Sequence, residues 1–114
     1  MLELLKNKGK FKEEEYIPIF EGIVRSLHYL HQKKILHRDI KLDNILLDWE
    51  KNVKVCDFGV SRKMKKNEKI FEHIGTPAYL APEIIKEKGY EGFSADIWSL
   101  GILSFIALTG EVPF

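Results

Sequence analysis

The feature that most limits the possible folds is an apolar run of twelve residues, Ile97–Leu108, near the end of the sequence. It is interrupted by three small residues, Ser99, Gly101 and Ser104. A helix that crosses a bilayer needs about 20 apolar residues, so this run is too short to span a membrane. A helix of this length that is apolar on every side is typical of the centre of a globular core. With Ser94 as a favourable N-cap and Gly110 as an end, we expect a buried helix over residues 94–108.

The composition agrees with a small globular domain. Of the 114 residues, 45% are hydrophobic and 31% are charged, which excludes collagen-like and disordered chains. The 18 basic residues nearly balance the 17 acidic ones, so the overall charge predicts binding of neither nucleic acid nor an anionic membrane. The single cysteine, Cys56, excludes an internal disulfide. Together with the lack of an export signal at Met1, it favours a cytoplasmic or nuclear location.

The patterns before the apolar run predict three further helices. Leu2–Lys8 has a short helical pattern that Gly9 ends, and Pro82–Lys88 has another. A longer amphipathic helix is expected over about residues 16–32, behind the acidic residues Glu13–Glu15 that favour a helix N-terminus. Its apolar positions recur at helical spacing: Phe20, Ile23, Val24, Leu27 and Leu30.

Short β-type runs lie between residues 35 and 55. They are Ile35–Leu36, Ile45–Leu47 and Val53–Val55. Asp48–Asn52 is expected to form a hairpin turn between the last two runs. Residues 57–81 show no sustained periodicity, and a stretch of that length without regular structure is usually functional or disordered. We therefore expect one α+β domain over residues 1–114, mainly α-helical with short β-hairpins.

Three polar motifs carry the chemistry. The first is His37-Arg38-Asp39-Ile40-Lys41-Leu42-Asp43-Asn44, and Asp57-Phe58-Gly59 and Ala81-Pro82-Glu83 follow it in order. A chance match to the fixed polar positions of the first motif alone is on the order of one in a few million per start. The set resembles the protein kinase family, in which a catalytic loop, a magnesium-binding Asp-Phe-Gly and an Ala-Pro-Glu occur in this order. The resemblance covers essentially all 114 residues and is closest to the calcium/calmodulin-dependent kinase-like group.

The resemblance implies a site for phosphoryl transfer, which depends mainly on positioning and on charge neutralisation. Asp39 would orient the substrate hydroxyl and accept its proton, and Lys41 would place a positive charge beside the transferred phosphate of ATP. Asn44 and Asp57 would hold Mg²⁺ through the hard oxygen ligands that this ion prefers. Leu46 would pack beneath the adenine ring.

The resemblance also implies which hydroxyl is phosphorylated. Lys41 lies two residues after Asp39, and Gly75–Tyr79 follows the activation loop, as in the serine/threonine branch of the family. Thr76 would bridge Asp39 and Lys41 through its hydroxyl. The expected substrates are therefore serine and threonine residues of proteins. Asp43 lies where some members bind basic substrate residues, and a solvated carboxylate is an equal alternative.

Other residues are expected to support the site. His37 would pack on Phe58, and Asp96 would accept backbone N–H groups from the catalytic loop, because a buried carboxylate needs donors. Glu83 would pair with an arginine beyond residue 114. Cys56 is a small buried residue in one interpretation and a reactive thiol in the other.

One position suggests regulation. An arginine such as Arg38, directly before the catalytic aspartate, usually binds a phosphate on the activation loop, yet the only hydroxyl between Gly59 and Gly75 is that of Ser61. Glu72 lies three residues before Gly75. Our hypothesis is that Glu72 replaces the phosphate and pairs with Arg38 and Arg62. The alternative is that Glu72 is a solvated loop residue.

The 114 residues contain no Gly-rich phosphate loop. The expectation is a large-lobe fragment, without the small lobe and the final helices, that alone binds ATP poorly and is inactive. Two other functions are possible for such a chain. One is a non-catalytic, pseudokinase-like interaction module. The other is a small-molecule phosphotransferase, against which the segment 75–83 argues because it resembles a peptide-binding surface.

Overall fold

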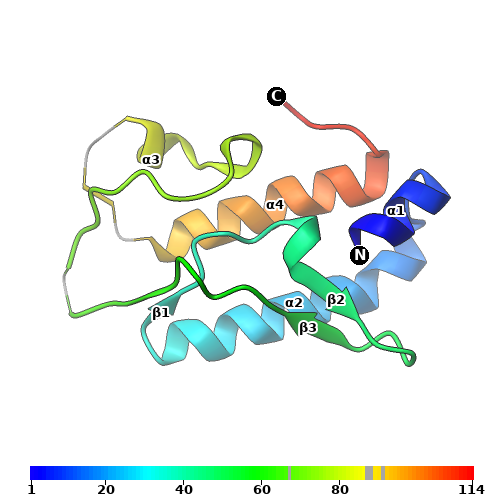
Figure 1. The fold of residues 1–114 in the computed structure, drawn as a ribbon, viewed down its shortest axis with the longest axis horizontal. Helices are drawn as coiled ribbons and strands as arrows, with labels where there is room; N and C mark the ends of the chain where they lie inside the picture. Colours follow the sequence, from blue (N-terminus) through cyan, green and yellow to red (C-terminus); the bar gives the residue numbers. More distant parts are fainter. Residues whose placement is uncertain (67, 87–88, 91) are drawn as a thin grey trace.

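The computed structural model describes residues 1–66, 68–86, 89–90 and 92–114. Two long helices, α2 and α4, form its centre, and the other elements pack around them (Figure 1). The elements in chain order are α1 (Leu2–Lys8), α2 (Glu13–Gln32), β1 (Ile35–Leu36), the 3₁₀ helix η1 (Leu42–Asn44), β2 (Ile45–Leu47), β3 (Val53–Val55), β4 (Arg62–Lys63), the 3₁₀ helix η2 (Pro77–Tyr79), α3 (Pro82–Ile85) and α4 (Phe93–Thr109). The expected α+β architecture, mainly helical with short strands, is confirmed.

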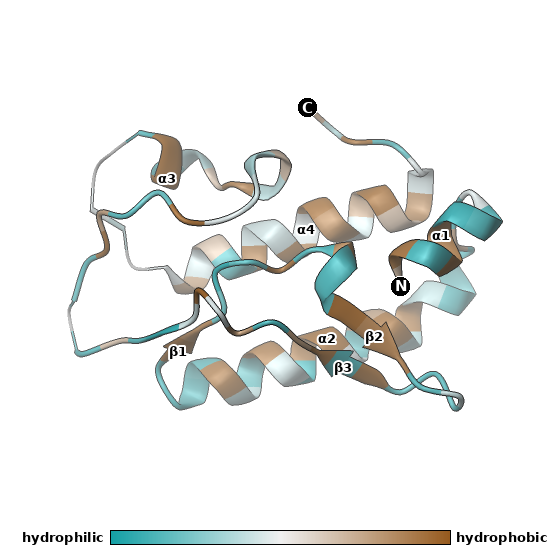
Figure 2. Ribbon diagram, viewed as in Figure 1, coloured by the Kyte–Doolittle hydropathy of each residue, from teal (hydrophilic) through white to brown (hydrophobic). Residues whose placement is uncertain are grey.

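Helix α4 contains the predicted apolar run, but it is not buried on every side, because Ile97 and Phe105 are exposed. Leu103 and Ala107 are fully buried against α2, whose Ile23 is fully buried as well. The hydroxyls of Tyr16 on α2 and Ser104 on α4 form a hydrogen bond of 2.6 Å. Figure 2 shows apolar residues through the C-terminal half of α4 and on β2, which packs against the same core. No helix in the described ranges is both long enough and apolar enough to cross a membrane.

The start of α4 differs from the expectation. Gly92, and not Ser94, is its N-cap, with φ of 93°, and Ser94 is the second residue of the helix. Two features of position 92 require glycine. Its backbone conformation is left-handed, and a Cβ there would lie 2.2 Å from Cδ1 of Leu36. The hydroxyl of Ser94 donates a long hydrogen bond of 3.5 Å to Glu83 instead of capping the helix.

Helix α2 begins earlier than the apolar pattern indicates. The three acidic residues expected at its N-terminus form its first turn, and the carboxylate of Glu15 accepts the N–H of Lys12 at 3.2 Å. Its buried face consists of Tyr16, Ile19, Ile23, Leu27 and Leu30. Phe20 and Val24 are exposed, although their spacing fits an apolar face, because they lie at the edge of the stripe that contacts α4.

The predicted hairpin is present. Strands β2 and β3 pair antiparallel with Ile45 opposite Val55, and Asp48 closes the turn by accepting the N–H groups of Glu50 and Asn52. The expected β-type run Ile35–Leu36 is strand β1, and it pairs antiparallel with β4. Neither β4 nor this pairing was expected, because a two-residue strand carries no periodic signal. Residues 57–81 thus contain β4 and η2.

Helix α3 is shorter than the expected Pro82–Lys88. It ends at Ile85, and residues 87 and 88 of the expected helix lie outside the described residues. Met64 and Ala81 share a second apolar cluster with the N-terminal part of α4. The segment that contains the Ala-Pro-Glu motif is therefore attached to the same central helix as the first motif.

Candidate active site

Helix α4 anchors the loop that carries the first motif. The Asp96 side chain is 2% exposed and accepts the backbone N–H groups of His37 and Arg38, both at 3.0 Å. His31 Nε2 lies 2.9 Å from Oδ2 of the same carboxylate. Three donors satisfy the buried charge, which would otherwise be costly. The contacts expected of Asp96 are present, whereas no sequence pattern indicated His31.

His37 joins the first two motifs. Its Nε2 lies 2.9 Å from the carbonyl oxygen of Cys56, and its Nδ1 lies 3.1 Å from the backbone N of Asp39. Because a carbonyl only accepts and a backbone N–H only donates, the imidazole is the neutral tautomer with its proton on Nε2. The ring meets Phe58 edge-on at a centroid distance of 4.9 Å, as expected. His37 therefore fixes the positions of the residues next to it and has no free nitrogen.

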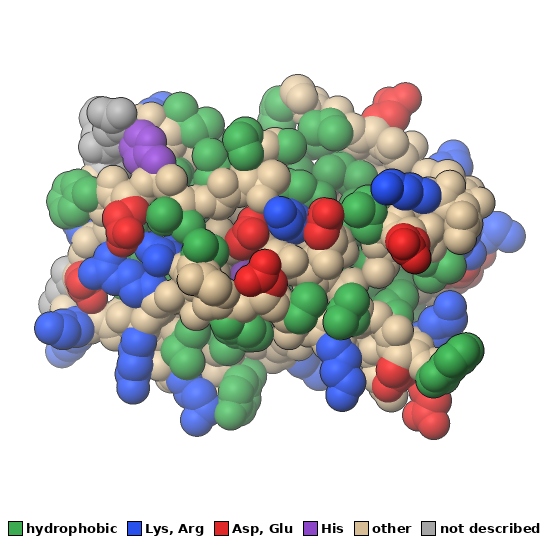
Figure 3. Space-filling view, in the orientation of Figure 1, with side chains coloured by type: hydrophobic (Ala, Val, Ile, Leu, Met, Phe, Trp, Pro, Cys, Tyr) green, Lys and Arg blue, Asp and Glu red, His purple; other side chains and the backbone are tan. Residues whose placement is uncertain are grey.

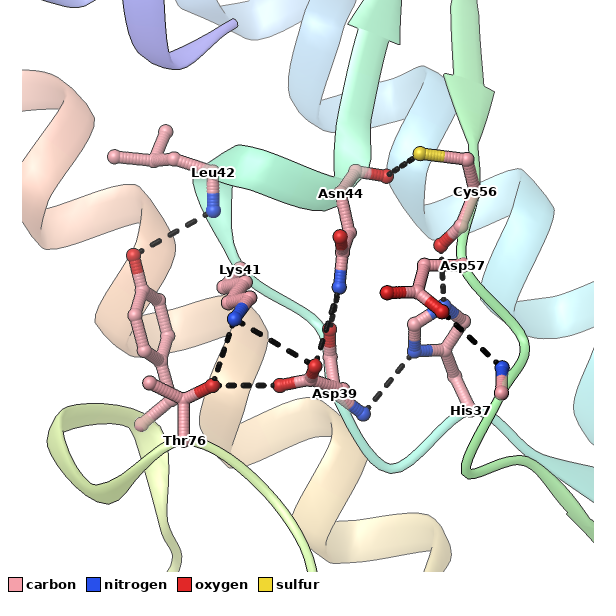
Figure 4. A network of polar contacts seen from close by, with 10 residues as sticks. His37, Asp39, Lys41, Leu42, Asn44, Cys56, Asp57 and Thr76 are labelled. Atoms are coloured by element: carbon pink, nitrogen blue, oxygen red, sulfur yellow. Dashed lines mark hydrogen bonds and ion pairs between the residues drawn. The ribbon is translucent and has the colours of Figure 1, made fainter.

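Asp39, Lys41 and Thr76 converge on one point, although Thr76 comes from a separate segment (Figure 4). The Thr76 hydroxyl donates to Oδ1 of Asp39 at 2.8 Å and accepts from Nζ of Lys41 at 3.0 Å. Lys41 Nζ also lies 3.7 Å from Oδ2 of Asp39. The bridge that the sequence suggested for Thr76 is present, and it holds a carboxylate and an ammonium group side by side.

Asn44 closes the loop from the other side. Its amide nitrogen donates to the backbone oxygen of Asp39 at 2.8 Å, so the amide oxygen is not engaged in that hydrogen bond. The Cys56 N–H donates to the Asn44 backbone oxygen at 2.9 Å, which places Asp57 beside this loop. Cys56 is half-buried, and its thiol faces the same backbone oxygen at 3.3 Å.

Asn44 and Asp57 fit the chemistry of a magnesium site. Asp57 is exposed, has a left-handed φ of 60°, and accepts the Gly59 N–H on Oδ1 at 3.2 Å. Mg²⁺ is usually bound by one or two protein oxygen ligands, with water and phosphate oxygens completing its shell. Within the described ranges, no group of three or more His, Cys, Asp or Glu residues could hold a metal ion by itself. A site shared with a nucleotide therefore suits these residues better than a closed one.

A buried phenol lies beneath the loop. The Tyr79 hydroxyl accepts a long hydrogen bond of 3.5 Å from the N–H of Leu42. Burial raises the pKa of Tyr79, and the charges of Asp43 and Asp39 raise it further, so the phenol stays neutral at physiological pH. Asp43 itself is exposed on η1, and Leu46 on β2 is 51% exposed. Both side chains are accessible to a ligand.

The residues singled out for regulation meet. Nη1 of Arg38 and Nη1 of Arg62 each lie 3.1 Å from the same oxygen, Oε1 of Glu72. Glu83 is half-buried, and in the part of the chain that the structure describes its hydrogen-bond donor is the hydroxyl of Ser94.

Comparisons with known proteins agree with this geometry. Residues 1–114 match the family model described as protein kinase domain. CBL-interacting protein kinase 31 of Oryza sativa subsp. japonica is 40% identical over 117 residues, covering 100% of this chain and 26% of that kinase. CBL-interacting serine/threonine-protein kinase 13 of Arabidopsis thaliana is 44% identical over 110 residues, covering 94% of this chain and 22% of that protein.

A third relative is also named as a serine/threonine kinase. Serine/threonine-protein kinase SAPK3 of Oryza sativa subsp. indica is 40% identical over 116 residues, covering 100% of this chain and 35% of that protein. The chain thus spans between 22% and 35% of the length of these three relatives. Because the family model matches the chain from end to end, and because the site geometry is assembled from the family's motifs, the chain belongs to the protein kinase family.

Proposed function

We propose that this chain is part of a serine/threonine protein kinase that transfers the γ-phosphate of Mg–ATP to serine or threonine residues of proteins. The observation that carries the proposal is the convergence of Asp39, Lys41 and Thr76, with Asn44 and Asp57 beside it. The names of the relatives as serine/threonine kinases support it.

The chain's own residues would divide the reaction among them. Asp39 would accept the proton of the substrate hydroxyl while the hydroxyl oxygen attacks the γ-phosphorus of ATP. The bond between the γ-phosphorus and the β–γ bridging oxygen breaks, and ADP leaves with the electron pair of that bond. Lys41, held 3.7 Å from Asp39, would offset the negative charge of the transferred group. Asn44 and Asp57 would hold the Mg²⁺ ion, which when bound neutralises phosphate charge.

The exposed residues near the site would contribute to recognition. Leu46 would provide an apolar surface for adenine, and Asp43 would attract basic residues next to the substrate hydroxyl. We also propose that the 114 residues by themselves bind ATP weakly. They supply groups that face the phosphates and the metal, but their sequence has no Gly-rich loop to enclose the nucleotide.

The test is the transfer of labelled γ-phosphate to a mixed serine/threonine substrate by the full-length protein with Mg²⁺. Asp39→Ala is expected to lower the rate by about 10²–10⁴-fold. The control is Glu111→Ala, which removes an exposed charge elsewhere. A full-length protein that labels no substrate, or one that labels it equally fast after Asp39→Ala, would overturn the proposal and leave a non-catalytic interaction module.

A further inference from the structure

Four charged side chains form a cluster beside the site, the Glu72 cluster, made of Arg38, Arg62, Glu68 and Glu72. We infer that Glu72 is a positioning residue that holds the catalytic loop in its working shape without any phosphate on this segment. This inference rests on the proposed kinase function. It concerns the regulation of that site: the enzyme would be active without phosphorylation between residues 59 and 75.

The contacts of Arg38 show how tightly the cluster is attached to the loop. Its Nη1 donates to Oε1 of Glu72 at 3.1 Å, and its Nε donates to the backbone oxygen of Val60 at 2.5 Å. The side chain is 11% exposed, so the guanidinium is held at two points in a partly buried place. Arg38 has a φ of 72°, a conformation that non-glycine residues keep only where their surroundings hold it. Asp39 follows directly, so its placement depends on this conformation.

Glu72 is fixed on its own side as well. Its backbone oxygen accepts the hydroxyl of Tyr90 at 2.7 Å. Ile70 and Tyr90 exchange two backbone hydrogen bonds of 2.8 and 3.0 Å. Thr76, which bonds to Asp39, lies four residues further along the chain. Glu72 therefore links the position of Arg38 to the segment that delivers Thr76.

The cluster is already balanced in charge. Arg62 binds Glu72 at 3.1 Å with Nη1 and also forms an ion pair with Glu68. The backbone N–H of Lys65 is the main group that lowers the pKa of Glu68, and the charge of Arg62 lowers it further, so Glu68 is ionised. Two guanidinium groups thus face two carboxylates. Figure 3 shows basic and acidic side chains gathered together on this part of the surface.

The segment also lacks a hydroxyl suited to replace Glu72. Between Gly59 and Gly75 the only serine, threonine or tyrosine is Ser61. Its hydroxyl donates to the backbone oxygen of Phe58 at 2.8 Å, within the turn that follows Asp57. Since Glu72 is 52% exposed, its pairs with arginine should also weaken as salt increases.

The decisive experiment compares Glu72→Gln with Glu68→Gln in the full-length protein. Both changes remove one carboxylate from the Glu72 cluster, but only the first removes the partner of Arg38. Glu72→Gln is expected to lower kcat about tenfold and to change the KM for ATP less than about twofold. The kcat of Glu68→Gln is expected to stay within about twofold of the wild-type kcat. Glu72→Ser is expected to be as slow as Glu72→Gln and to recover when phosphoserine is installed at position 72, because a phosphate restores the charge. Phosphatase treatment is expected to leave the wild-type activity unchanged.

A structural measurement separates this inference from the proposed function. Amide hydrogens of residues 72–76 are expected to exchange about tenfold faster in Glu72→Gln than in Glu68→Gln, whether or not the protein phosphorylates anything. Equal exchange in the two variants, wild-type kcat in Glu72→Gln, or loss of wild-type activity after phosphatase treatment would each overturn the role of Glu72. If Asp39→Ala abolishes activity while Glu72→Gln does not, the proposed kinase function stands and only this inference fails.

Discussion

The hydroxyl of Thr76 donates a hydrogen bond of 2.8 Å to Oδ1 of Asp39, across 37 positions of sequence. The Thr76 hydroxyl oxygen in turn accepts a hydrogen bond from Nζ of Lys41 at 3.0 Å. One small side chain thus connects the loop after β1 with the segment before α3, and it bridges the Asp39 carboxylate and the Lys41 ammonium group, which also lie 3.7 Å apart. Its position makes the geometry of the site depend on the fold of a distant segment.

Replacing this hydroxyl should affect the rate of reaction more than the binding of nucleotide. A hydrogen bond to a charged group contributes about 1.5–3 kcal/mol, so Thr76→Val should lower kcat by about 10- to 150-fold in the full-length protein. Thr76→Ser keeps the hydroxyl and should retain most of the activity. Thr109→Val, a matched change at the exposed end of α4, is the control. Steady-state kinetics with unchanged kcat for Thr76→Val would contradict the prediction.

The pair Asn44 and Asp57 can be tested through the dependence on metal. Asn44→Ala removes an amide oxygen suited to Mg²⁺ and also the hydrogen bond of 2.8 Å to the backbone of Asp39. In Asn44→Ala we expect the Mg²⁺ concentration for half-maximal velocity to rise by about tenfold or more. Asp57→Asn by itself should raise this concentration more than Asn44→Ala does, because a charged ligand is lost. The matched change Asn52→Ala, in the β2–β3 turn, should leave it unaltered. An unchanged Mg²⁺ requirement in Asn44→Ala would exclude that residue as a ligand.

Asp96 should be important for stability as well as for the site. Asp96→Ala leaves three donors without their acceptor, the N–H groups of His37 and Arg38 and the ring of His31. An unsatisfied buried donor costs about 1–3 kcal/mol, so we expect the free energy of unfolding to fall by about 3 kcal/mol or more. Denaturation by urea measures this loss. His31→Ala, which removes only one of the three donors, should cost less, and equal losses would show that the backbone contacts of Asp96 are unimportant.

The turn between β2 and β3 should make stability sensitive to acid. The backbone N–H of Asn52 is the main group that lowers the pKa of Asp48 from its usual 3.8. Because the pKa of the folded state lies below that of the unfolded state, the carboxylate stabilises the fold above about pH 4. This stabilisation is lost as the pH falls through the lowered pKa. Asp48→Asn should therefore flatten the decline of unfolding free energy between about pH 5 and pH 2, whereas Glu111→Gln should not.

The close contact between α2 and the hairpin predicts a size-dependent effect at Gly22. A Cβ there would lie 2.8 Å from Cγ2 of Val53, so Gly22→Ala should destabilise the protein by about 1–3 kcal/mol through overpacking. The same change should cost less in a Val53→Gly background, which removes Cγ2 and also the Cβ of Val53, 2.9 Å from the added Cβ. Gly101→Ala, on α4 where a Cβ would meet no atom within 4 Å, should be neutral or stabilising. Equal effects at the two glycines, measured by thermal melting, would contradict the packing argument.

Much of the local structure followed from the sequence. Leu2–Lys8 and the Asp48–Asn52 turn were predicted correctly, because a glycine stop and side-chain bonds within a turn act over a few residues. Ser94 as an N-cap was wrong, since the choice between Ser94 and Gly92 depends on how closely Leu36 approaches the backbone. Strand β1 was predicted as the run Ile35–Leu36, whereas β4 escaped prediction because only its pairing with β1 defines it.

The sequence by itself determined which chemical groups are available. They are the side chains of Asp39, Lys41 and Asn44 in the first motif, the carboxylate of Asp57 and the apolar run that forms α4. The tertiary structure decided how these groups meet. It directs the donors of His37 and Arg38 onto Asp96 and gives both Arg38 and Arg62 the same oxygen of Glu72. Both contacts were expected from the family resemblance, and no local sequence pattern indicated them. Residue type and periodicity encode interactions over one or two turns of chain, whereas contacts between segments 34 to 59 positions apart depend on the path of the whole backbone around α4.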